Sequence, residues 1–126
     1  MSAKAKISKV ANLFYTTAVV SAVIGYFAVQ SQTLTGTLFG LVLSLGFTFV
    51  VSRLLLGGSS FVRKIVLFCN VAAMGLVSLG MAASVLSISS APLRSIVAIG
   101  WLGWSFLLHF RSFTTLKDSD VKRMFA

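Results

Sequence analysis

The polar side chains that lie inside the apolar stretches of this sequence are the ones whose types and spacing could do chemistry. Asn70 sits within the run "IVLFCNVAAMG", where a carboxamide costs free energy unless it finds a hydrogen-bond partner. Asn12 and Arg53 occupy comparable depths in two other apolar runs. Hydrogen bonds between helices in lipid contribute about 0.6 kcal/mol each. The pattern predicts a polar cross-link among Asn12, Arg53 and Asn70, and the functional alternative is a ligand or partner site around Asn70 and Arg53.

Catalytic and metal-binding chemistry would have to come from very few residues. The chain has one histidine, His109, one cysteine, Cys69, and two acids, Asp118 and Asp120. Neither acid lies in an apolar stretch, whereas proton-coupled transport and intramembrane acid–base chemistry depend on ionisable groups placed there. A structural zinc site needs four protein ligands. We therefore expect no catalytic residue, no metal and no cofactor, with His109 as an interfacial aromatic and Cys69 as a small core residue.

The elements that must position these residues are apolar helices. Of the 126 residues, 57% are hydrophobic and 10% are charged, whereas soluble domains carry about a quarter charged residues. The charges cluster and leave apolar runs of roughly 20 residues, the length that crosses a bilayer as a helix. The sequence predicts one all-α membrane domain over 1–126, an antiparallel four-helix bundle in up-down-up-down order with short loops. Its transmembrane helices are expected at about 10–30, 35–56, 64–86 and 92–110.

Basic residues gather in the segments that fall on one side of this predicted bundle, and Arg94 alone lies on the other. By the positive-inside rule, both termini face the cytoplasm, and we expect a multi-pass protein of the bacterial inner (plasma) membrane. The net charge of +9 then indicates attraction to the anionic inner leaflet of the lipid bilayer and no nucleic acid partner. The basic residues on the cytoplasmic side are Lys4, Lys6, Lys9, Arg53, Arg63, Lys64, Arg111, Lys117, Lys122 and Arg123.

Small residues recur at every fourth position in the first three predicted spans. Such residues allow helices in lipid to approach closely, because burial there brings no hydrophobic gain. In the second span Gly36, Gly40 and Ser44 are expected to form a packing seam inside the bundle. Gly80 and Ser84 are expected to do the same in the third span.

Two surfaces are predicted to face other molecules. Trp101 and Trp104 form a ridge near mid-depth, which packs within the bundle or is offered to another membrane protein. The tail 111–126 contains a short amphipathic helix that Asp118 or Ser119 can cap. It lies on the inner leaflet or docks against a partner. Its expected contact residues are Val121, Lys122, Arg123 and Phe125.

These features favour a non-enzymatic accessory or regulatory membrane protein that acts through contacts with a larger envelope complex. Assembly factors, secretion or conjugation accessories, and exclusion or immunity proteins have this build. The expected partner is another membrane protein or a second copy of the chain. The alternative is an oligomeric pore or holin-like channel lined by the Gly, Ser and Thr side chains of the second span.

Overall fold

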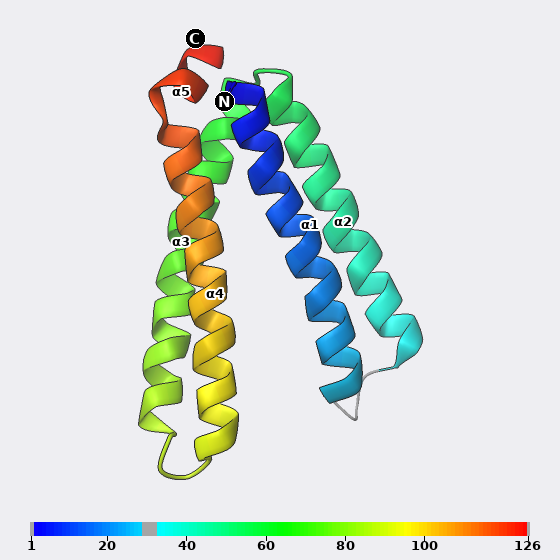
Figure 1. The fold of residues 1–126 in the computed structure, drawn as a ribbon, viewed down its shortest axis with the longest axis vertical. Helices are drawn as coiled ribbons and strands as arrows, with labels where there is room; N and C mark the ends of the chain where they lie inside the picture. Colours follow the sequence, from blue (N-terminus) through cyan, green and yellow to red (C-terminus); the bar gives the residue numbers. More distant parts are fainter. Residues whose placement is uncertain (1, 29–32, 126) are drawn as a thin grey trace.

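The computed structural model describes residues 2–28 and 33–125, and the regular elements in those residues are all α-helices (Figure 1). Four of them are long and apolar enough to cross a membrane. The predicted all-helical class and the four apolar spans are therefore confirmed, and both fit a multi-pass membrane protein. The helices are α1 (Ala3–Ala28), α2 (Leu34–Leu56), α3 (Ser60–Leu86), α4 (Pro92–Lys117) and α5 (Ser119–Met124).

The helix boundaries depart from the predicted ones at the charged ends. The first helix begins at Ala3, seven residues before the predicted start, and the fourth runs on to Lys117, although its end was expected near residue 110. Basic residues mark the edge of the hydrocarbon layer, but their long aliphatic stems are compatible with a continuing helix. The charge pattern therefore did not predict the end of either helix. The predicted end of the first span, residue 30, lies outside the described residues.

Local signals explain where the middle helices begin and end. The Thr33 side chain caps α2 by accepting a hydrogen bond from the Gly36 N–H, and Ser59 caps α3 by accepting from the Val62 N–H. Between α2 and α3, Gly58 has a φ of 81°, a left-handed conformation that a residue with a Cβ adopts only with strain. These caps allow a three-residue turn (57–59) to join two long helices.

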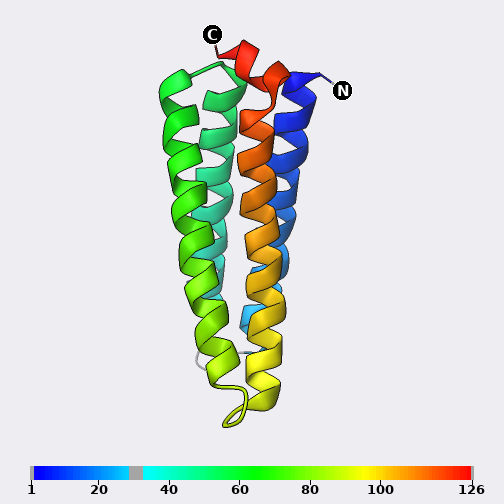
Figure 2. The same cartoon turned by 90° about the vertical axis from the view of Figure 1, so that its left-hand side faces the viewer.

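The helices form two pairs, α1 with α2 and α3 with α4, which lie one behind the other in Figure 2. Figure 1 shows that the pairs meet at the end that holds both termini, α5 and the α2–α3 turn. Toward the opposite end, where α3 connects to α4, the pairs move apart. The molecule therefore has a closed end and an open end.

The hydrophobic core lies at the closed end. Its four buried members come from four different helices: Ile7 of α1, Leu55 of α2, Leu116 of α4 and Val121 of α5. Val121 is the most deeply buried, with 0% of its surface exposed. We call these four residues the clamp, because they join both helix pairs to α5.

The small-residue seams behave differently in the two halves of the molecule. A Cβ built on Gly80 would stand 3.2 Å from a methyl carbon of Leu102, so α3 and α4 approach closely there. Ser84, one turn on, is half-buried and donates its hydroxyl hydrogen to the Gly80 carbonyl. A Cβ on Gly40 would meet nothing within 4 Å, and one on Gly36 would meet only its own cap residue, Thr33. The packing seam predicted for Gly36, Gly40 and Ser44 is therefore wrong: all three residues are exposed, and no helix of residues 2–28 and 33–125 packs on them.

Replacing Gly80 with leucine should destabilise the α3–α4 pair by about 1–3 kcal/mol, because the new side chain overlaps Leu102. Gly75→Leu is the matched control, since a Cβ on Gly75 of the same helix meets nothing within 4 Å. The free energy of unfolding in mixed micelles titrated with dodecyl sulfate measures both. Equal stabilities of the two variants would contradict close packing at Gly80.

Candidate functional site

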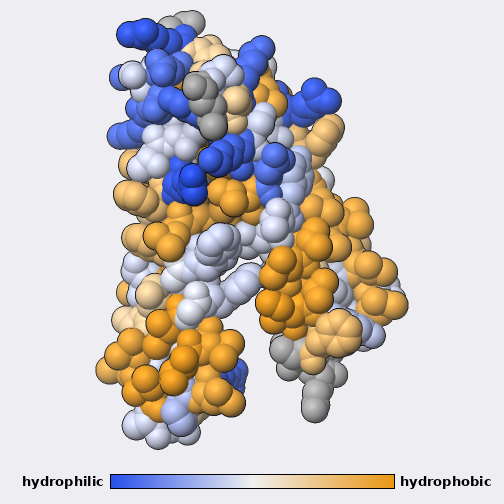
Figure 3. All heavy atoms as spheres, viewed as in Figure 1, coloured by the Kyte–Doolittle hydropathy of each residue, from blue (hydrophilic) through white to orange (hydrophobic). Residues whose placement is uncertain are grey.

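The main hollow of the molecule is a cleft between the two helix pairs, with a volume of about 1150 Å³. Residues from α1, α2, α3 and α4 all line it. Figure 3 shows the surface hollowed between two arms covered by apolar side chains, whereas hydrophilic side chains gather at the closed end. Because both helix pairs contribute to its wall, the cleft exists only when the two pairs are packed together.

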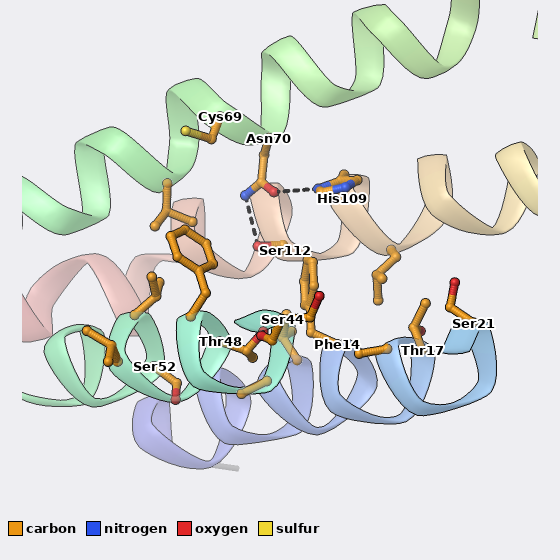
Figure 4. Close-up of a pocket in the computed structure, with 18 of the residues that line it drawn as sticks. Phe14, Thr17, Ser21, Ser44, Thr48, Ser52, Cys69, Asn70, His109 and Ser112 are labelled. Atoms are coloured by element: carbon orange, nitrogen blue, oxygen red, sulfur yellow. Dashed lines mark hydrogen bonds between the residues drawn. The ribbon is translucent and has the colours of Figure 1, made fainter. Parts of the chain in front are cut away.

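The α2 wall of the cleft is the small-residue stripe of the sequence. Each step of four residues turns a helix by about 40°, so the five members of the stripe cover roughly 160° of its surface. All five nevertheless line the cleft, which therefore borders α2 along most of its length. Three members, Ser44, Thr48 and Ser52, are labelled in Figure 4 opposite Asn70 and Ser112. The stripe comprises Gly36, Gly40, Ser44, Thr48 and Ser52.

A hydrogen-bonded trio lies in the opposite wall (Figure 4). Asn70 of α3 donates from Nδ2 to Ser112 Oγ of α4, over 2.8 Å. Its Oδ1 lies 3.0 Å from His109 Nδ1, also of α4. Asn70 and Ser112 are buried, with exposed fractions of 3% and 5%. The Asn70 carboxamide thus links α3 to α4, as a polar group inside a transmembrane bundle is expected to do.

The predicted cross-link among Asn12, Arg53 and Asn70 is wrong in its partners. Asn12 and Arg53 instead line a separate groove of about 180 Å³ formed by α1 and α2. The Arg53 guanidinium carbon lies 5.3 Å from the centre of the Phe49 ring, a cation–π contact within α2. A ligand site shared by Asn70 and Arg53 is not formed, because the two residues belong to different hollows.

Two members of the trio, His109 and Ser112, were not predicted as site residues. His109 lies against the edge of Phe14 of α1, with 5.5 Å between ring centres, and lines the cleft. The prediction of His109 as an interfacial aromatic therefore missed its contacts with Phe14 and Asn70. The sequence signal that could have identified His109 and Ser112 is their spacing. Residues three apart lie on one face of a helix, so both side chains face the same neighbouring helix.

The tryptophan ridge is divided between the cleft and the α1–α4 contact. Trp101 is half-buried and lines the cleft. Trp104 donates from Nε1 to Thr17 Oγ1 of α1 over 3.1 Å, while 45% of its surface stays exposed. Cys69, expected in the core, is exposed and also lines the cleft.

The tail helix α5 packs on its own chain. Val121 belongs to the clamp and is not available to a partner, which corrects its assignment to an exposed contact surface. Phe125 is half-buried, and its ring centre lies 5.7 Å from the guanidinium carbon of Arg63. Lys122 and Arg123 are exposed at the closed end and remain available as basic contacts.

An ion pair ties α1 to the start of α5. Lys6 Nζ lies 3.1 Å from both carboxylate oxygens of Asp118 and 3.4 Å from Asp120 Oδ2. Asp118 also caps α5, as predicted, by accepting a hydrogen bond from the Asp120 N–H. The Lys6 hydrogen bonds, followed by that of the Asp120 amide, lower the pKa of Asp118 below its ordinary value of 3.8.

This lowered pKa predicts a loss of stability in acid. Because the carboxylate is favoured in the folded state, its contribution is present above about pH 3.8 and is lost as the pH falls through the lowered folded pKa. Asp118→Asn should therefore be less stable than the wild type at pH 6, with a smaller further loss on acidification to pH 3. Unfolding titrations at both pH values measure this. Parallel pH dependences of the two proteins would contradict it.

Comparison of the chain with protein-family models, with curated proteins and with solved structures found no match. What the site can do therefore follows from its own geometry.

Proposed function

We propose that this protein is a non-enzymatic accessory protein of the membrane that holds a transmembrane helix of a partner protein in its cleft. The observation that carries the proposal is the α2 stripe, a wall of small residues that faces a hollow. Small residues stabilise contacts in lipid when another helix packs against them. Lipid tails gain no comparable advantage from such a wall.

The size of the cleft suits part of a helix. A helix is about 10 Å across and rises 1.5 Å per residue, so each residue fills roughly 120 Å³. The cleft of about 1150 Å³ therefore has room for a segment of a helix, and it opens toward one end of the molecule.

The proposal includes an orientation. The bundle runs up-down-up-down, with both termini and the closed end on the cytoplasmic side of a bacterial inner membrane. The support is the clustering of hydrophilic side chains at the closed end (Figure 3) together with the positive-inside rule. In this orientation the cleft opens toward the outer leaflet, and Lys122 and Arg123 face the anionic inner leaflet or a cytoplasmic part of the partner.

Among the described residues that line the cleft there is no carboxylate, and we therefore propose binding without catalysis. His109 Nδ1 contacts the carboxamide of Asn70, which, unlike a carboxylate, carries no charge that would stabilise a protonated ring, so His109 lacks the partner that activates a general base. Asp118 and Asp120 both contact Lys6 at the closed end.

The test measures binding of a model helix in vesicles. The probe is a peptide of 20 leucine and alanine residues flanked by lysine pairs, with a dansyl group at its centre. Energy transfer from Trp101 and Trp104 to dansyl should be saturable at a constant ratio of peptide to lipid and reversed by unlabelled peptide. Transfer that only follows the surface density of the peptide would refute helix binding.

A second candidate is an oligomeric pore, which is favoured by the hydroxyl groups of Ser44, Thr48 and Ser52 on the cleft wall. Several copies would have to join these walls around one aqueous path. Planar-bilayer recording of purified protein separates the two candidates, because a helix-binding protein is electrically silent.

A further inference from the structure

The trio on the cleft wall leaves one ring nitrogen of His109 free to act on the contents of the cleft. Nδ1 lies 3.0 Å from Asn70 Oδ1. An amide oxygen carries no hydrogen, so Nδ1 is the donor in this contact. In the neutral ring, the proton on Nδ1 leaves Nε2 with a lone pair and no hydrogen. His109 therefore presents an acceptor at its far nitrogen.

The orientation of the ring is held from two sides. The Asn70 carboxamide that receives Nδ1–H is itself anchored through Nδ2 to Ser112. On the α1 side, the Phe14 ring meets the imidazole edge-on, at an interplanar angle of 71°. The two contacts come from α3 and α1, so both helix pairs contribute to the position of this ring.

The Nε2 atom is accessible, and its residue lines the cleft. No hydrogen bond to Nε2 forms within residues 2–28 and 33–125, whereas the buried side-chain nitrogen and oxygen atoms of those residues all have partners. Nε2 therefore lies at a surface, and His109 lines the cleft. An acceptor without a partner in a low-dielectric setting favours a ligand that brings a donor, because leaving the acceptor unpaired costs free energy.

From this geometry, and resting on the function proposed above, we propose that His109 Nε2 accepts a hydrogen bond from the partner helix and so selects its class. The partner is an apolar transmembrane helix that carries one uncharged donor, a Ser, Thr, Asn or Gln side chain, at the depth of His109. A purely aliphatic helix fits the small-residue wall of α2 but leaves Nε2 unpaired. The α2 wall thus provides general helix affinity, and His109 provides specificity.

The first experiment uses the fact that His109 is the only histidine of the chain. Protein labelled with ¹⁵N-histidine gives two ring signals in vesicles, one from each nitrogen. In the free protein we expect Nδ1 protonated and Nε2 unprotonated. Addition of the lysine-flanked peptide with a central Asn should shift the Nε2 signal, whereas the all-leucine/alanine peptide should leave it unchanged. A protonated Nε2 in the free protein, or equal responses to both peptides, overturns the proposal.

The second experiment measures selectivity with the energy-transfer assay. Three peptides carry Asn at successive central positions, and the fourth carries Leu. The best Asn peptide should bind about three-fold more tightly than the Leu peptide, and at most roughly 18-fold, the range expected for one hydrogen bond between helices. In His109→Phe the ratio of the two affinities should fall to about one, whatever the absolute affinity of the variant for the Leu peptide. An advantage that survives in His109→Phe overturns the proposal.

The outcomes separate this proposal from the function on which it rests. If neither peptide binds the wild type saturably, helix binding itself fails. If both bind with equal affinity, helix binding stands and selection by His109 fails. If His109→Phe does not fold, the ring signals of the wild type still decide the matter.

Discussion

Val121→Asp should open the closed end of the molecule and cost about 3 kcal/mol or more of unfolding free energy, as expected for an unpaired charge in a buried site. Val121 is fully buried against Ile7, Leu55 and Leu116, so a carboxylate there has no access to water without moving α5. Loss of α5 from the clamp would leave the helix pairs joined by the α2–α3 turn and by the α1–α4 contacts. The effect is measured by dodecyl sulfate titration and by the distance distribution between spin labels on α2 and α4 at the open end.

Ser119→Asp is the matched control for this change. It adds the same side chain to the same short helix, at an exposed position of its first turn, where a negative charge is favourable. Its stability and label distances should equal those of the wild type. If Val121→Asp behaves like Ser119→Asp, α5 is not a structural part of the closed end.

Gly40→Phe should abolish binding of the model helix while leaving the fold intact. Gly40 lines the cleft, and a Cβ there meets nothing within 4 Å, so the new ring enters open space instead of a packed interface. The ring would occupy the surface on which a helix must approach α2 closely. We expect a loss of affinity of ten-fold or more in the energy-transfer assay, which corresponds to about 1.4 kcal/mol or more.

Gly46→Phe controls for the added ring and for the loss of a glycine. Gly46 lies on the same helix and also has open space around its Cβ, but it does not line the cleft. Both variants should unfold at the same detergent concentration, and only Gly40→Phe should lose peptide binding. A parallel loss in both would assign the effect to α2 as a whole and not to the cleft.

The four spans were predictable because the free energy of crossing a bilayer depends on length and composition alone. Runs of apolar residues carry that information residue by residue. The helix ends at Ala3 and Lys117 were missed because charge reports where the hydrocarbon ends, whereas a helix ends where its backbone loses partners.

The site was only partly predictable, since a pattern of small residues does not say what lies opposite it. Gly40 and Gly80 look alike in the sequence, yet Gly80 contacts Leu102 and Gly40 faces the cleft. The difference is set by how far apart the two helix pairs stand, which is decided by the clamp and not by either stripe. Similarly, Asn70 was identified as a polar group that needs a partner, but its partners depended on the rotation of α4, which brings His109 and Ser112 toward it.

Because the hydrophobic core lies at the closed end, the two helix pairs are held together there and can rotate relative to each other about that end. Beyond Trp104, which contacts Thr17 of α1, α4 continues to Pro92 as a free arm of about 18 Å at 1.5 Å per residue. A rotation of roughly 10° at the closed end displaces the tip of this arm by about 3 Å. A small displacement of α5 at the closed end is thus expected to produce a larger change in the width of the cleft at the open end.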